Sequence, residues 1–144
     1  MMQYRPMTIA DYEETVQLWQ NTSGVRLRGT DSQEHIANYL ARNPGLSFVA
    51  TLNHGIVGTL MAGHDGRRGY LQHLAVAAAH RRKGIGTALV NRCVAALAQQ
   101  GIVRSHISIL ADNHDGKAFW IALGWQQRTD IETCSFINGG DSNC

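Results

Sequence analysis

The chain has 144 residues, of which 44% are hydrophobic and 17% are charged, and its formal net charge is +2 at pH 7. This length and composition are typical of one globular domain with a single core, and they exclude a disordered or fibrous protein. A charge so close to zero favours neither a nucleic-acid partner nor an acidic membrane surface. No apolar run reaches the roughly 18 residues that are needed to span a bilayer.

The three cysteines, Cys93, Cys134 and Cys144, are odd in number and lack the spacing of metal ligands. They therefore predict neither a disulfide framework nor a metal site. The N-terminus has no charged segment followed by a long apolar stretch, which a secretory signal would require. We expect a cytoplasmic protein without a bound metal.

The first elements in the chain are a strand and a helix. Residues 2–7 predict a short strand. Thr8 then acts as the expected helix cap, with Asp11 three residues later completing a capping box. Residues 21–30 contain glycines and arginines and predict a loop.

A second helix and three strands follow this loop. Asp31 with Glu34 predicts a second capping box, and Asn43-Pro44-Gly45 ends the helix that it opens. Alternating apolar residues and intervening turns then predict three strands, over residues 46–52, 56–63 and 70–77.

The period of the pattern then changes from that of a strand to that of a helix. Apolar residues recur every four positions, at Ile85, Leu89, Cys93 and Leu97. This stripe predicts a long amphipathic helix, which Gly101 ends. A strand is predicted over residues 102–110, and a short helix, capped by Asn113 or Asp115, over residues 113–124. One or two last strands are predicted over residues 125–137.

The predicted order is therefore β-α-α-β-β-β-α-β-α-β(-β), an α/β fold with a mixed sheet of six to seven strands. Residues 1–137 are expected to form one domain, and residues 138–144 a polar C-terminal tail.

A glycine-rich basic segment joins the strand ending at residues 74–76 to the long helix. It consists of Arg81, Arg82, Lys83, Gly84, Ile85, Gly86 and Thr87. Glycines let backbone N–H groups approach a ligand, and a helix N-terminus carries free donors and a partial positive charge. The segment therefore predicts a site for a pyrophosphate or another polyanion. The alternative is a solvated basic turn.

Two other nucleotide-binding motifs do not fit this segment. The dinucleotide fingerprint needs a third glycine where this chain has Leu89. The phosphate-binding P-loop needs Gly-Lys-Ser/Thr, whereas here Lys83 precedes Gly84.

Two blocks of residues carry a resemblance to a known family. The loop has the spacing Arg81-x-x-Gly84-x-Gly86, and a later block reads Asn113-x-x-Gly116-x-x-Phe119-Trp120-x-x-Leu123-Gly124-Trp125. In this order they resemble the acetyl-CoA signature and the later Asn…Leu-Gly-aromatic element of the GNAT N-acetyltransferase superfamily. The resemblance covers about residues 3–137. It is closest to small single-domain bacterial members, which share the Asp-Gly-x-Arg-Gly turn found here at residues 65–69.

The resemblance implies a GNAT-like sheet that is splayed between its fourth and fifth strands, with a bulge in the fourth. It also implies transfer of an acetyl group from acetyl-CoA, as co-substrate, to a primary amine of a small molecule or peptide. Loop amides would hold the pyrophosphate, and the fourth strand would pair with the pantetheine arm. The residues that would contact acetyl-CoA are Leu74, Ala75, Val76, Arg81, Arg82, Lys83, Gly84, Ile85, Gly86, Thr87, Asn113, Phe119 and Trp120.

The catalytic groups depart from the pattern of the family. Neither the fourth nor the fifth predicted strand offers a carboxylate as base, and Trp120 stands where the family often has a tyrosine acid. Indole is not a useful proton donor to a thiolate, so Trp120 is expected to pack along the slot that would hold the acetyl group or the pantetheine arm. His73 is the best replacement base. The alternative is a strand histidine satisfied by a neighbour, and weaker candidates are His106, His114 and Asp112.

Two functions remain open at this point. One is the acetyltransferase, and the other is a non-catalytic acyl-CoA-binding or sensor module of the same fold. The resemblance implies acetyl-CoA and an amine acceptor as partners, with no nucleic acid and no membrane, and it leaves a homodimer open. Arg26 and Arg28 lie in the loop that borders the acceptor site in the family. They are candidates for binding an acidic acceptor group, or else ordinary solvated arginines.

Overall fold

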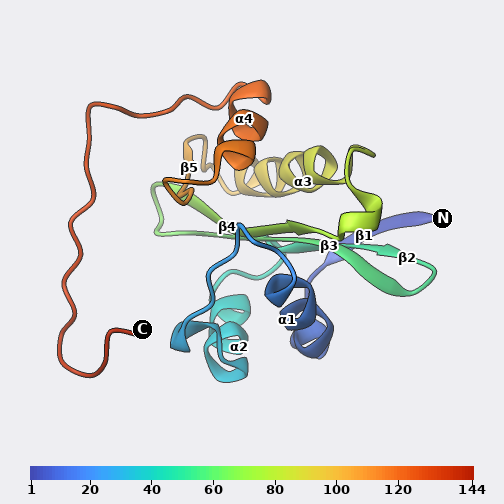
Figure 1. Cartoon of the computed structure of the whole chain (residues 1–144), viewed down its shortest axis with the longest axis horizontal. Coiled ribbons are helices and arrows are strands. Elements are labelled where there is room, and N and C mark those ends of the chain that lie inside the picture. The colour runs from blue at the N-terminus through green and yellow to red at the C-terminus, as the bar shows by residue number, and fades with distance from the viewer.

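The computed structural model describes residues 1–144, and its sheet lies between two layers of helices (Figure 1). Helices α1 and α2 cover one face of the sheet, and α3 and α4 cover the other. The strands are β1 (Met2–Pro6), β2 (Phe48–Leu52), β3 (Gly55–His64), β4 (Gly69–Val76) and β5 (Ser105–Ile107). The helices are α1 (Tyr12–Gln20), α2 (Gln33–Arg42), α3 (Ile85–Gln99) and α4 (His114–Ala122), with 3₁₀ turns η1 (Ile9–Asp11), η2 (Gly29–Asp31) and η3 (Ala78–His80).

The five strands follow one another in space in the order of the sequence, β1-β2-β3-β4-β5. Neighbouring strands are antiparallel except for β4 and β5, which are parallel. The long helix α3 provides the crossover that a parallel pair requires. As far as α4, the elements follow the order predicted from the sequence.

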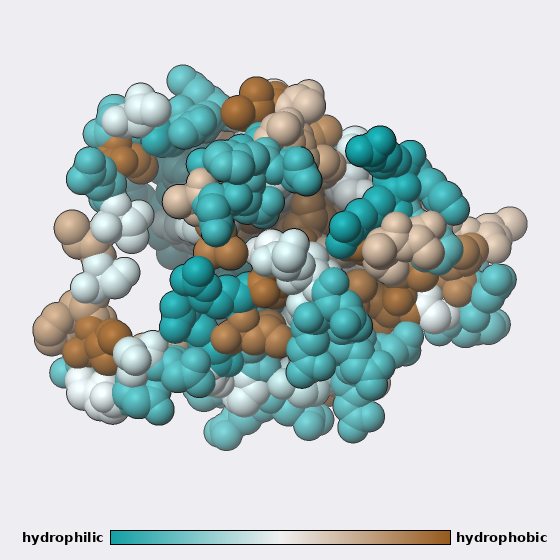
Figure 2. Space-filling view, in the orientation of Figure 1, coloured by the Kyte–Doolittle hydropathy of each residue, from teal (hydrophilic) through white to brown (hydrophobic).

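The prediction of one or two last strands over residues 125–137 is wrong, so the mixed sheet has five strands rather than six or seven. Beyond Trp125, which packs against Trp120, this segment stands clear of the rest of the molecule, and Figure 2 shows open space beside it. Its few large apolar side chains, including Phe136 at 88% exposure, are not buried. With so little apolar surface to bury, ordering the segment as strands has no compensating gain.

Two apolar cores lie on the two faces of the sheet. The larger one packs the predicted stripe of α3 against β2, β3 and β4, and Leu89 and Cys93 are fully buried in it. The smaller one packs Trp19 of α1 and Ile36 of α2 against the opposite face. No helix is both long and apolar enough to cross a membrane.

Of the two capping boxes predicted for the first two helices, the structure contains the first and not the second. The backbone N–H of Thr8 donates to Asp11 Oδ2 over 2.9 Å, as a capping box predicts. The second predicted box is wrong, because α2 is capped by Ser32, whose hydroxyl accepts from the N–H of His35. Asp31 therefore does not cap α2 and is available for another role.

An extra residue in β4 produces a bulge at His73. The pairing of β3 with β4 shifts register between Thr59 and Met61, and His73 has a φ of 59°. A left-handed backbone is uncommon for a residue other than glycine. Pairing of β4 with β5 ends at Leu71, just before the bulge. The two strands therefore separate at the place where the resemblance implied that they would.

Thr59 fixes this bulge from the neighbouring strand. Its hydroxyl donates to the carbonyl oxygen of His73 over 3.1 Å and accepts from Nε1 of Trp19 over 2.9 Å. Both Trp19 and Thr59 are fully buried. The loss of the hydroxyl would leave a buried indole N–H without a partner, which costs free energy.

We expect Thr59→Val to lower the free energy of unfolding by about 1–3 kcal/mol, measured by urea denaturation. Thr51→Val is the matched control, because Thr51 is also buried on a strand, at 7% exposure, and its side chain makes no hydrogen bond. Equal stability losses in the two variants would show that the hydroxyl of Thr59 does not support the bulge.

Candidate active site

The glycine-rich loop lies at the N-terminus of α3, as predicted. Gly84 is the residue before the helix and has a φ of 80°, a conformation that favours glycine. Ile85 is buried, so the loop presents its backbone there rather than that side chain. The Nε of Arg81 donates to the carbonyl oxygen of Val76 over 3.1 Å and ties the loop to the end of β4.

The second glycine of the loop brings α4 against α3. A Cβ atom on Gly86 would lie 3.1 Å from Cζ of Phe119 and 3.9 Å from Cγ2 of Val76. Such a side chain would push α4 away, because 3.1 Å is closer than ordinary carbon–carbon contact. Gly86 therefore places Phe119 beside the end of β4 and the start of α3.

The N-terminus of α4 meets the loop between α1 and α2. The side chain of Asn113 accepts from the N–H of Gly116 over 3.0 Å and caps the helix. A Cβ on Gly24 would lie 2.8 Å from Nδ2 of the same Asn113. These contacts bring residues 21–28 and α4 together, although they come from opposite ends of the chain and opposite faces of the sheet.

The remaining predicted contacts divide between surface and core. Arg82 and Lys83 are exposed and form no ion pair. The side chain of Ala75 is buried on the α1 side of the sheet, so only its backbone is available on the α3 side. Trp120 is 5% exposed and packs edge-on against Phe119 and Trp125, which makes it a core residue at the side of the slot.

His73 and Asp31 form an ion-pair geometry on the α1 side of β4. His73 Nε2 lies 2.6 Å from Asp31 Oδ1, and each side chain is 13% exposed. The indole of Trp19 packs edge-on against the imidazole, with 4.8 Å between ring centroids. Burial by itself raises the pKa of Asp31, but hydrogen bonds from His73 and from the backbone N–H of Arg28 outweigh it and leave the pKa lowered.

The charge on Asp31 decides which nitrogen of His73 carries a proton. An ionised carboxylate can only accept a hydrogen bond, so Nε2 must hold the proton that it donates. Neutral His73 then has its lone pair on Nδ1, which makes no hydrogen bond in the structure. An orienting carboxylate on one nitrogen and a free lone pair on the other is the arrangement of a general base.

Sequence reasoning did not find Asp31 as part of this site. The two residues are 42 positions apart, and the local pattern of Asp31 with Glu34 predicted a helix cap. No spacing rule connects them. The weaker candidates lie elsewhere: His106 stacks beside Tyr70, and Asp112 and His114 precede or begin α4.

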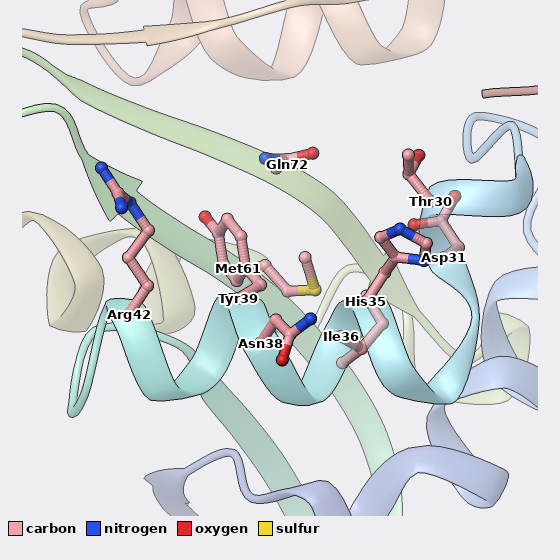
Figure 3. A pocket seen from close by; sticks show the side chains of 9 residues that line it. All are labelled: Thr30, Asp31, His35, Ile36, Asn38, Tyr39, Arg42, Met61 and Gln72. Carbon is pink, nitrogen blue, oxygen red and sulfur yellow. The ribbon is translucent and has the colours of Figure 1, made fainter.

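A pocket of about 410 Å³ opens beside Asp31, between α2 and the sheet (Figure 3). We call it the α2 pocket. It is lined by Thr30, Asp31, His35, Ile36, Asn38, Tyr39, Arg42, Met61 and Gln72. A smaller cavity of about 280 Å³ adjoins it toward the β3–β4 turn and shares Tyr39, Arg42 and Gln72. Burial raises the pKa of Tyr39 to about 12.

The arginines of the loop between the first two helices do not line this pocket. Nη1 of Arg28 donates to the carbonyl oxygen of Ser142 over 3.2 Å. Beside it, the N–H of Gly29 donates to the carbonyl oxygen of Asn143 over 2.6 Å. Arg28 thus holds the C-terminal tail against η2.

The site therefore combines a glycine-rich helix start, a pair of strands that separate beyond Leu71, and a pocket of about 410 Å³ next to the Asp31–His73 pair. The model of the Acetyltransferase (GNAT) family matches residues 12–125, which is most of the chain. The chain belongs to the GNAT family of acetyltransferases. Members of this family use acetyl-CoA, and the resemblance of the loop and of the Asn113 block to the family is thereby confirmed.

Individual relatives agree with this assignment. An acetyltransferase of Pectobacterium atrosepticum is 30% identical over 139 residues, which covers 96% of this chain and 94% of the relative. A crystal structure of a predicted acetyltransferase with acetyl-CoA from Clostridium acetobutylicum has a TM-score of 0.76 at 19% identity, covering 94% and 96% of the two chains. The PaiA N-acetyltransferase from Thermoplasma acidophilum, in complex with coenzyme A, has a TM-score of 0.74 at 18% identity, covering 85% and 88%.

Gly84 allows the loop of this GNAT acetyltransferase to be tested without a clash, although its φ of 80° strains any side chain placed there. Nothing lies within 4 Å of a Cβ built on it, whereas the same addition at Gly86 meets Phe119. Gly84→Asp adds a negative charge at the helix start, where we predict the pyrophosphate to bind. CoA affinity measured by calorimetry should fall at least tenfold, or about 1.4 kcal/mol.

Gly84→Asn is the matched control for this prediction. Asparagine has nearly the shape of aspartate and tolerates a positive φ, but it carries no charge. It should retain much more CoA affinity than Gly84→Asp, and the difference should shrink at high salt. Equal affinities of the two variants and the wild type would remove the loop from the CoA site.

Proposed function

We propose that this GNAT acetyltransferase moves the acetyl group of acetyl-CoA to a primary amine of a small molecule or peptide, with His73 as the general base and Asp31 as its positioning residue. The observation that carries the proposal is the 2.6 Å contact between His73 Nε2 and Asp31 Oδ1 at the bulge of β4. It supplies a base on a strand that lacks any carboxylate of its own.

The residues predicted to hold acetyl-CoA fit its chemistry. The backbone amides of residues 82–87 at the start of α3 would bind the pyrophosphate, with Arg81, Arg82 and Lys83 adding positive charge. The backbone of residues 74–76 lies beyond the end of the β4–β5 pairing and would pair with the pantetheine arm. Asn113, Phe119 and Trp120 would form the opposite wall.

In the proposed reaction, His73 accepts the proton that the acceptor amine loses. The amine nitrogen attacks the thioester carbonyl carbon, a C–N bond forms, and the excess proton on nitrogen passes to Nδ1 of His73. The charge of Asp31 stabilises the imidazolium that results. A backbone N–H in the splayed part of β4 would stabilise the oxyanion. The C–S bond breaks as the carbonyl re-forms.

The leaving thiolate has no dedicated acid in this arrangement. Trp120 occupies the position of the usual tyrosine and is buried in the core, so it cannot donate a proton. A thiolate with a pKa near 8.5, by analogy with cysteine, leaves without prior protonation or takes a proton from water. Positioning and oxyanion stabilisation then provide the rest of the rate.

This lack of an acid is the observation that favours the second candidate function, a non-catalytic acyl-CoA-binding or sensor module. The two functions are separated by incubating the protein with acetyl-CoA and a broad panel of amines and measuring free thiol. Turnover with any amine supports the enzyme, and CoA binding without turnover across the panel supports the sensor.

We expect His73→Asn to lower kcat/KM about 10²-fold, at the low end for the loss of a general base, with CoA affinity unchanged. Asparagine keeps the positive φ of the bulge, but it cannot accept the proton, and its amide is too short to replace Nε2 in the contact with Asp31. The wild type should show an ascending step in kcat/KM with rising pH, as expected for a general base, and the variant should lose it.

His54→Asn is the control, since His54 is also a histidine at positive φ but lies in the exposed β2–β3 turn. It should keep the activity and the pH profile of the wild type. Asp31→Asn should reduce kcat/KM without abolishing the step, because it disturbs the orientation of His73 and leaves the base in place. Full activity and an unchanged profile in His73→Asn would show that the base is elsewhere or is solvent.

A further inference from the structure

The α2 pocket and the cavity beside it form one trough along α2. Both are lined by Tyr39, Arg42 and Gln72, so they meet at these residues. Asp31 lies at one end, next to His73, and the β3–β4 turn lies at the other. Figure 3 shows Tyr39 and Arg42 extending from α2 toward β4, with His35 near Asp31.

The charges in this trough are unequally compensated. Asp31 is paired with His73, and Asp65 accepts hydrogen bonds from the N–H groups of Arg67 and Arg68. Arg42 is exposed and forms neither an ion pair nor a side-chain hydrogen bond. Arg42 is therefore a positive charge without an ion pair where the two cavities meet, and the carboxylate of Asp65, which also forms no ion pair, lies beyond it near the β3–β4 turn.

A second unpartnered group lies beside Arg42. The hydroxyl oxygen of Tyr39 is buried and makes no hydrogen bond, although the side chain of Gln72 lies close enough to lower its pKa. A buried hydroxyl without a partner is costly and calls for one. Burial raises the pKa of Tyr39 to about 12, so the group stays protonated and can donate. Tyr39 and Arg42 are three residues apart on α2 and thus neighbours on one face of the helix.

We infer that the acceptor of this acetyltransferase carries an anionic group, a carboxylate, that binds between Arg42 and Tyr39 while its amine lies beside His73. The inference rests on the proposed function. A guanidinium is a donor only, and a neutral hydroxyl can donate as well, so together they match the oxygens of a carboxylate. A polyamine would instead place a cation against Arg42.

The length of the trough limits the size of this acceptor. Asp31 lies in η2, before α2 begins at Gln33, and the six steps from Gln33 to Tyr39 along α2 rise roughly 9 Å. Allowing for the side chains, the amine and the carboxylate should be about 10 Å apart, which is the span of about three extended residues. The acceptor class is therefore a short peptide or chain of that length, and not a single α-amino acid.

The test compares triglycine with triglycinamide, whose amines are alike but whose C-terminal charges differ. We expect KM for triglycine to be about fivefold lower, as for one exposed charge pair, with similar kcat. Arg42→Gln should remove the preference for triglycine, and Tyr39→Phe should reduce it. Arg128→Gln, the control, removes an equal charge from an exposed side chain outside the trough and should leave it intact.

A ligand-observed NMR titration of the protein–CoA complex with the same two tripeptides separates this inference from the proposed function. Charge-dependent binding that Arg42→Gln abolishes supports the inference even where acetyl transfer is not seen. Transfer to amines without any preference for triglycine overturns the inference and leaves the proposed function standing. Equal binding of triglycine and triglycinamide, or their equal failure to bind, also overturns the inference.

Discussion

The extra residue at His73 in β4 is the constraint on which the rest of the site depends. It shifts the register against β3, and the pairing with β5 ends immediately before it. Without the bulge, β4 and β5 could continue side by side, and the gap in which we propose that the pantetheine arm binds would close. The same bulge directs the imidazole to the α1 side, against Trp19 and Asp31. One backbone irregularity thus shapes both the proposed pantetheine site and the position of His73, the proposed base.

Asp31 joins the loop after α1 to this bulge, and its charge makes the stability of the folded protein depend on pH. Its pKa is lowered in the folded protein, so its contribution to stability is fully present above the pKa of an ordinary aspartate, about 3.9, and is lost as the pH falls through that region. At neutral pH the carboxylate is therefore charged, which holds the proton of His73 on Nε2. Because Tyr12 also donates to the carbonyl oxygen of Asp31, the 3₁₀ turn η2 is fixed from both the helix and the strand.

Much of this arrangement was accessible from the sequence because it depends on local patterns. The glycine spacing, the α3 stripe and the Asn113 cap are each specified by neighbours within a few residues, and all three appear in the structure. The partner of His73 was not accessible, because a contact across 42 residues leaves no periodic trace. The one or two strands predicted over residues 125–137 do not form, because the segment has too few apolar side chains to pack at the edge of β5.

The two faces of the sheet divide the proposed chemistry between them, and β4 is the element that both share. On the α3 side lie the glycine-rich loop, Phe119 and the buried Trp120, which we propose hold acetyl-CoA, the co-substrate of the family. On the α2 side lie the trough and its unpaired Arg42, which touch none of those residues. Substitutions along α2 can therefore change the acceptor without disturbing the loop at the start of α3. If selectivity resides in Arg42 and Tyr39, two side chains on one exposed helix face distinguish this enzyme from relatives with the same fold.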